Sequence, residues 1–176
     1  MENHTNFAGT RSAANRTIRF DIRRGHFSRW MGQGQQPKEY DYVEGRLVGI
    51  ALRKRETQSG EMTYMDIIFV NGDTRFSVSS IASGSVSAEI ISKLANIRDV
   101  RSTVRVEVWA KEQYTNCSVR ENGEKLPFRI LPKVEKVQRG FSVSFDTTER
   151  DAAVMKLIEE LNARLAQAAG SGNYTN

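Results

Sequence analysis

The stretch GIALRKRETQSGEMTYMDIIFVNGDTRFSV, residues 49–78, contains the end of one strand pattern and two complete strand patterns after it. The second and third patterns meet at Asn71 and Gly72. Asn-Gly is the pair that best fits a two-residue hairpin turn, because both turn positions need positive φ. The first pattern ends in three consecutive cations at 53–55, where the chain turns. The stretch predicts three antiparallel strands joined by short turns, with a cationic cluster at one turn.

Alternation of side chains assigns the two faces of each strand. In the first strand, the residues predicted to face the core are Val48, Ile50 and Leu52. Leu47 is predicted to face outward, and two glycines allow this strand to bend sharply. In the second strand, the carboxylate of Asp66 marks the face that is predicted to meet solvent.

The rest of the chain adds a short helix, two more strands and a long helix. Helical spacing of apolar residues behind a Ser-rich start predicts a helix over residues 83–97. Alternating valines predict a fourth strand over residues 102–113, and a fifth follows over 114–120, with a short return at 126–131. A capping-box pattern and an apolar stripe predict an amphipathic helix over residues 146–169 that packs on its own domain.

Composition divides the chain into four parts. They are a basic, partly flexible N-terminal arm (1–39), a β-domain (40–145), the C-terminal helix (146–169) and a polar tail (170–176). The arm holds seven cations against three carboxylates, so it carries +4 of the net charge of +5. Its basic and aromatic segment around His26 and Trp30 either folds over nucleic acid or docks on the β-domain. Docking is favoured for Trp30, because a large aromatic side chain gains much from burial.

The order of elements over residues 40–130 resembles that of OB-fold single-stranded DNA-binding proteins, in the divergent form carried by phages and mobile elements. A bent, glycine-containing strand leads to two hairpin-linked strands, a helix and two further strands. The resemblance implies a mainly β fold with α: a five-stranded OB-like barrel with a helix between its third and fourth strands. The C-terminal amphipathic helix is not part of that family's usual pattern. The resemblance also implies single-stranded DNA binding without sequence preference, in replication or recombination.

Single-strand binding of this kind needs cations that follow the phosphate backbone and aromatic faces on which bases stack, each stack contributing roughly 1–3 kcal/mol. The residues predicted to form the nucleic-acid site are Arg53, Lys54, Arg55, Tyr64, Arg75, Arg105, Trp109, Lys111 and Tyr114. In the alternative interpretation, the N-terminal arm or the C-terminal helix covers Tyr64 and Trp109. The arginines then form a solvated rim.

The sequence contains no recognisable catalytic signature. A phosphate-binding loop, a dinucleotide fingerprint and a zinc-protease motif are all missing from it. One cysteine and two histidines cannot supply an intrachain disulfide or a Cys/His metal site. We therefore expect no enzyme, no cofactor and no metal. The enzymatic alternative is a magnesium-dependent nuclease using Asp66, Asp73 and Glu107, although isolated carboxylates on strands are usually solvated.

The balance of 26 Lys and Arg against 21 Asp and Glu is compatible with an anionic partner. No apolar run approaches the length of a membrane span, and the N-terminus lacks a signal-peptide pattern. We expect a cytoplasmic protein of a bacterial or phage-infected cell, with single-stranded DNA as partner, RNA as the alternative, and no membrane partner. Self-association into a homo-oligomer is a further alternative. The alternative function is a structural or assembly protein, such as a virion component, that uses the barrel and the C-terminal helix to bind other proteins.

Overall fold

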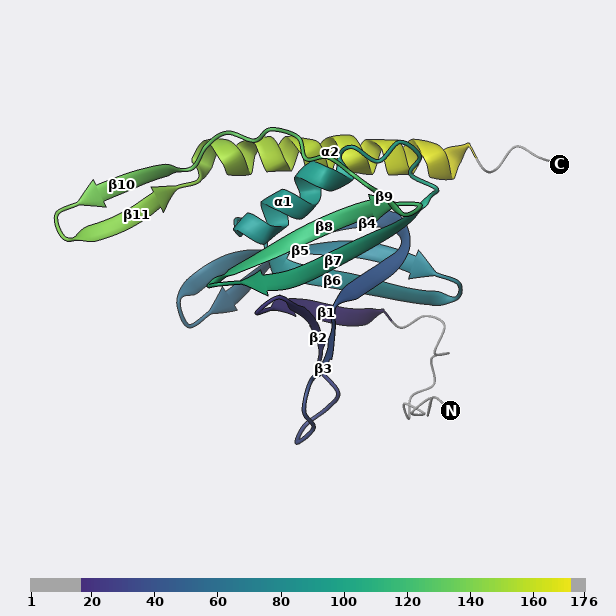
Figure 1. Ribbon diagram of the computed structural model, residues 1–176, viewed down its shortest axis with the longest axis horizontal. Helices are drawn as coiled ribbons and strands as arrows, with labels where there is room; N and C mark the ends of the chain where they lie inside the picture. The colour runs from purple at the N-terminus through teal and green to yellow at the C-terminus, as the bar shows by residue number, and fades with distance from the viewer. Residues whose placement is uncertain (1–16, 172–176) are drawn as a thin grey trace.

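The computed structural model describes residues 17–171, which form a mainly β structure with two helices (Figure 1). The strands of the large sheet are β1 (Ile18–Arg23), β2 (His26–Arg29), β3 (Lys38–Tyr40), β4 (Tyr42–Thr57), β5 (Gly60–Asn71), β6 (Thr74–Ile81), β7 (Thr103–Lys111), β8 (Tyr114–Glu121) and β9 (Glu124–Lys125). The helices are α1 (Ser85–Leu94) and α2 (Thr148–Gly170). A separate hairpin consists of β10 (Glu135–Arg139) and β11 (Ser142–Asp146). Neither described helix is both long and apolar enough to cross a membrane.

The strands of the large sheet follow the order β3-β2-β1-β6-β5-β4-β7-β8-β9. The antiparallel set β4, β5 and β6 confirms the three strands predicted from the opening stretch. The predicted closed barrel of five strands is not found, because nine strands pair in an open order. The physical reason is that β1 occupies the free edge of β6, where it pairs in parallel from Ile18 to Asp21.

A bulge in β4 resets the predicted alternation of that strand. The pairing with β5 shifts between Leu47 and Gly49, so that Val48 has no partner in the register. One extra residue in a strand reverses the face of every residue after it. Leu47 and Ile50 are therefore both buried, whereas Leu52 remains 37% exposed. The prediction for Ile50 is confirmed, and the one for Leu47 is wrong. Leu52 lies on the predicted face, opposite the buried Met65, although its side chain is not fully covered.

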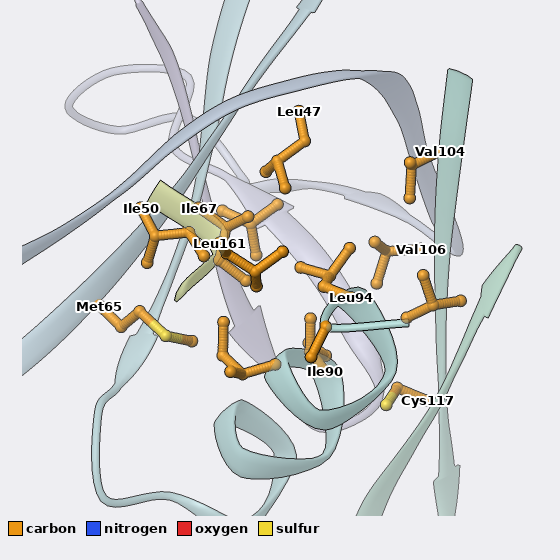
Figure 2. Close-up of a cluster of buried hydrophobic side chains, with 14 of the residues drawn as sticks. Leu47, Ile50, Met65, Ile67, Ile90, Leu94, Val104, Val106, Cys117 and Leu161 are labelled. Atoms are coloured by element: carbon orange, nitrogen blue, oxygen red, sulfur yellow. The ribbon is translucent and has the colours of Figure 1, made fainter. Parts of the chain in front are cut away.

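The core joins the sheet to both helices, as Figure 2 shows for side chains from β4, β5, β7 and the helices. The fully buried members include Leu47 and Met65 from the sheet, Ile90 and Leu94 from α1, and Leu161 from α2. Both helices appear where apolar spacing predicted them. Burial of an apolar side chain of this size contributes about 1.5–3 kcal/mol, so this cluster is the main source of fold stability.

The long helix α2 packs on its own chain, as predicted. Val154, Leu157 and Ile158 are buried along the same stripe as Leu161. The side chain of Asn162 also donates to the Ile50 carbonyl at 2.9 Å and accepts from the Ile50 amide at 3.0 Å. These two bonds satisfy the backbone of β4 just after its bulge. They fix α2 across the bent strand.

Two segments project from this body (Figure 1). The first is the loop of residues 30–37 between β2 and β3, and the second is the β10–β11 hairpin. No local pattern in the sequence predicted β2, β3 or this hairpin. All five residues of β11 are exposed, and the side chain of Phe141 at the hairpin turn is fully exposed.

Candidate nucleic-acid interface

The predicted site residues lie mainly on the sheet face that points away from the apolar core. Directly opposed residues of paired strands share a face. Arg53 of β4 lies opposite Tyr64 of β5, and Trp109 of β7 lies opposite Asn116 of β8. Figure 1 shows the β4–β5 and β7–β8 turns at the same end of the molecule.

Arg53 is held in a polar cluster that crosses four strands. Its guanidinium forms an ion pair with Asp66, including a 3.1 Å bond from one terminal nitrogen, and donates to the Ser79 hydroxyl at 3.4 Å. Arg19 of β1 donates to the same hydroxyl at 2.9 Å. Burial acts to raise the pKa of Asp66, but hydrogen bonds from Arg53 and Ser79 outweigh it and hold the pKa below its usual value. Asp66 thus faces outward as predicted, but it is buried beneath its arginine partner.

The other two cations of the opening stretch, Lys54 and Arg55, differ in whether a carboxylate neutralises their charge. Lys54 forms an exposed ion pair with Glu61, with 2.8 Å between Nζ and Oε1. Arg55 is exposed and makes no ion pair within residues 17–171. Of the three predicted phosphate ligands, Arg55 is therefore the one whose charge is left unneutralised. To contact a phosphate, Arg53 and Lys54 would each have to release its carboxylate partner or bind the carboxylate and the phosphate together.

Arg105 lies in a row of alternating charges rather than in a positive patch. Its Nε is 2.6 Å from a carboxylate oxygen of Glu44, and its guanidinium lies 4.3 Å from the centre of the Tyr42 ring. Next to it, Glu107 pairs with Arg120 at 3.6 Å. These four charged residues line a cavity of about 490 Å³ together with Thr103, Asn122 and Gly123. Two arginines against two glutamates leave this cavity without net charge, so it gives little attraction to an anion.

A second group, the Trp109 surface, consists of Arg24, Trp109, Lys111 and Tyr114. The side chains of Trp109 and Tyr114 are 43% and 60% exposed. Lys111 lies directly opposite Tyr114, and it shares the face of Trp109 because the two are two residues apart on β7. Neither Lys111 nor Arg24 makes an ion pair in the described part of the chain. This surface combines open aromatic rings with unneutralised cations, as stacking and phosphate contact require.

Arg24, in the turn between β1 and β2, is included in this group because the next residue, Gly25, lies against the backbone of Trp109 and Ala110. Arg24 and Gly25 both have positive φ, at 47° and 80°. A Cβ on Gly25 would lie 2.1 Å from the Ala110 nitrogen and 2.6 Å from the Trp109 carbonyl carbon, so only glycine permits this approach. The N-terminal strands therefore contact β7 directly at the predicted stacking residue. The sequence did not single out Arg24, although the glycine that follows it is a general turn signal.

The remaining predicted residues fall into two places. Tyr64 is half-buried beside Arg53, near the β4–β5 turn. Arg75 is exposed beside the β5–β6 turn, at the opposite end of β5. The structure thus brings together Trp109, Lys111 and Tyr114, groups Arg53, Lys54, Arg55 and Tyr64 near the β4–β5 turn, and places Arg75 apart.

The three carboxylates of the nuclease alternative do not converge. Asp66 is bonded to Arg53, Asp73 lies in the β5–β6 turn, and Glu107 accepts a bond from Ser118 at 2.9 Å. Across residues 17–171, no three His, Cys, Asp or Glu side chains gather closely enough to hold a metal ion. Cys117 is buried, and burial raises the pKa of its thiol to about 12.

Comparison with known proteins finds no matching family, no matching curated protein and no matching solved structure.

Proposed function

We propose that this protein binds single-stranded DNA without sequence preference, through the Trp109 surface and the neighbouring group around Arg53. The single observation that carries the proposal is the Trp109 surface itself. Two exposed rings and two cations that have no carboxylate partner among residues 17–171 share one end of the sheet. Bases supply flat faces for the rings, and phosphates supply charge for the cations. A role in replication or recombination within a bacterial or phage-infected cell belongs to the same proposal.

The order of the central strands supports an OB-like origin for the fold. In the sheet they run β6-β5-β4-β7-β8, and α1 lies between β6 and β7 in the chain. If these five strands are numbered one to five along the chain, from β4 to β8, their order across the sheet is 3-2-1-4-5. The helix α1 lies between strands three and four of this set. OB folds carry their helix at this position and bind oligonucleotides on an outer strand face. We propose that β1, β2 and β3 extend such a domain.

Titration of a labelled oligo(dT) with the full-length protein at several salt concentrations tests the proposal. Each phosphate contact on a single strand contributes about −0.7 to the slope of log K against log salt. Contacts from Arg24, Arg55 and Lys111 predict a slope of about −2. A duplex of equal length should bind more weakly, because its bases are already stacked on each other. Affinity that does not change with salt, or that is equal for duplex and single strand, would contradict the proposal.

One observation favours a second candidate, a structural or assembly protein. The β10–β11 hairpin exposes Phe141, Val143 and Phe145, which alternation places on one face. Apolar side chains in a projecting hairpin suit contact with another protein. Sedimentation or size-exclusion analysis distinguishes the candidates, because an assembly protein should associate without any nucleic acid.

A further inference from the structure

Two cations lie directly opposite each other where β2 and β3 leave the sheet. Arg29 is the last residue of β2, Lys38 is the first residue of β3, and the two form a cross-strand pair. Like charges at directly opposed positions destabilise a strand pair. Within residues 17–171, neither cation has a carboxylate partner. The Lys38 ammonium instead lies 5.2 Å from the centre of the Tyr40 ring.

An exposed tryptophan follows this pair. Trp30 opens the loop of residues 30–37, which projects from the sheet (Figure 1). Its side chain is 71% exposed, and that of Met31 is 38% exposed. The size of the indole predicted docking of Trp30 on the β-domain, but its side chain is largely exposed. An indole of this size gains from burial against any apolar or aromatic surface. The loop therefore carries a large, mostly exposed aromatic ring directly after the pair of cations at its base.

We propose that Arg29, Trp30 and Lys38 form a second contact for the same DNA strand, with the cations on phosphates and the indole on a base. This inference rests on the proposed function. An anion placed between Arg29 and Lys38 would remove their mutual repulsion, which no carboxylate of residues 17–171 relieves. A nucleic-acid strand supplies both this anion and a flat ring for Trp30, whereas an acidic peptide supplies only the charge.

The strand β2 connects the Trp109 surface to the proposed second contact at Trp30. Gly25 touches the Trp109 backbone, and Trp30 lies five residues further along the chain. At about 3.3 Å per residue in a strand, the separation is about 17 Å. A stacked strand advances about 3.4 Å per nucleotide, so roughly five nucleotides connect the two contacts. One oligonucleotide can therefore occupy both.

The substitution Lys38→Glu tests the inference, because stability and affinity should move in opposite directions. An acidic side chain opposite Arg29 replaces repulsion by attraction, so the melting temperature should stay the same or rise. Affinity for oligo(dT) should fall about tenfold through loss of phosphate contact. Lys156→Glu on α2 makes the same charge change at an exposed position far along the chain and serves as control, with about a twofold loss expected. Equal losses from the two variants would overturn the inference.

The variant Trp109→Phe leaves Trp30 as the one tryptophan and reports on it directly, since the chain has two. Oligo(dT) should quench its fluorescence. Unchanged Trp30 emission, together with quenching of Trp109 in Trp30→Phe, would overturn the inference and leave the proposed function standing. No oligonucleotide binding by the wild-type protein would overturn both. Binding of poly-glutamate that Lys38→Glu abolishes, with oligo(dT) affinity unchanged, would replace DNA by an acidic peptide at this loop.

Discussion

Arg53 shows how the role of one side chain depends on its neighbours in the folded sheet. Alternation places it on the outward face, but the sequence does not indicate that Asp66, thirteen residues later, lies one strand away and pairs with it. The hydrogen bond that Arg53 donates to Asp66 raises the pKa of Arg53, so this arginine stays charged at all ordinary pH values. The pair ties β4 to β5 at the end of the sheet that carries the proposed interface.

The first prediction concerns this ion pair. Asp66→Asn should lower the free energy of unfolding by about 1–3 kcal/mol at pH 7, because a charge-assisted hydrogen bond is lost. The pKa of Asp66 is lowered by folding, so its contribution is present above the ordinary value of 3.8 and is lost as pH falls through the folded pKa. The difference in melting temperature between the wild-type protein and Asp66→Asn should therefore be smaller at pH 2 than at pH 7.

The exposed turn residue Asp73 provides the matched control for that experiment. It makes no ion pair within the described residues, and Asp73→Asn should leave the melting temperature unchanged at both pH values. A difference in melting temperature between the wild-type protein and Asp66→Asn that stays constant from pH 7 to pH 2 would contradict the proposed role of the carboxylate.

At the scale of elements, local signals predicted most of the fold. The Asn-Gly turn predicted β5 and β6, and apolar spacing predicted both helices. The bulge at Val48 was not predictable, because its location depends on packing of Leu47 and Ile50 against residues distant in sequence. The parallel pair of β1 and β6 joins segments about sixty residues apart, and no local pattern encodes it. The missed parts of the interface, Arg24 and the Arg29–Lys38 pair, depend on the same N-terminal strands.

The second prediction concerns the β10–β11 hairpin. Changing Phe141 and Phe145 together to serine should alter the free energy of unfolding by no more than about 0.5 kcal/mol per site, because both rings are exposed. Phe69→Ala, in the core, should cost about 3–5 kcal/mol as the contrasting control. Chemical denaturation measures both.

A large loss of stability in the hairpin variant would show that the hairpin packs against its own chain or a second copy. Size-exclusion chromatography separates these outcomes. An oligomer that dissociates on substitution would favour the assembly function.

At the scale of the whole molecule, the aromatic and cationic groups form a connected path. The Arg53 cluster includes Arg19 of β1, the β1–β2 turn reaches Trp109, and β2 leads to Trp30 and the projecting loop. The sequence assigned Trp109, Lys111 and Tyr114 to one face because alternation alone decides it in the regular strands β7 and β8. It could not indicate that an N-terminal hairpin would join them, since that contact depends on the curvature of the entire sheet.

The most direct test of the central claim is the combined measurement of melting temperature and oligo(dT) affinity for Trp109→Ala. The indole is 43% exposed, so we predict little change in melting temperature. We predict that binding weakens by about 1–3 kcal/mol, the contribution of one base stack. A structural role predicts the reverse: a stability loss of about 3–5 kcal/mol with unchanged affinity of the folded protein. That reverse result would contradict the assignment of this surface to single-stranded DNA.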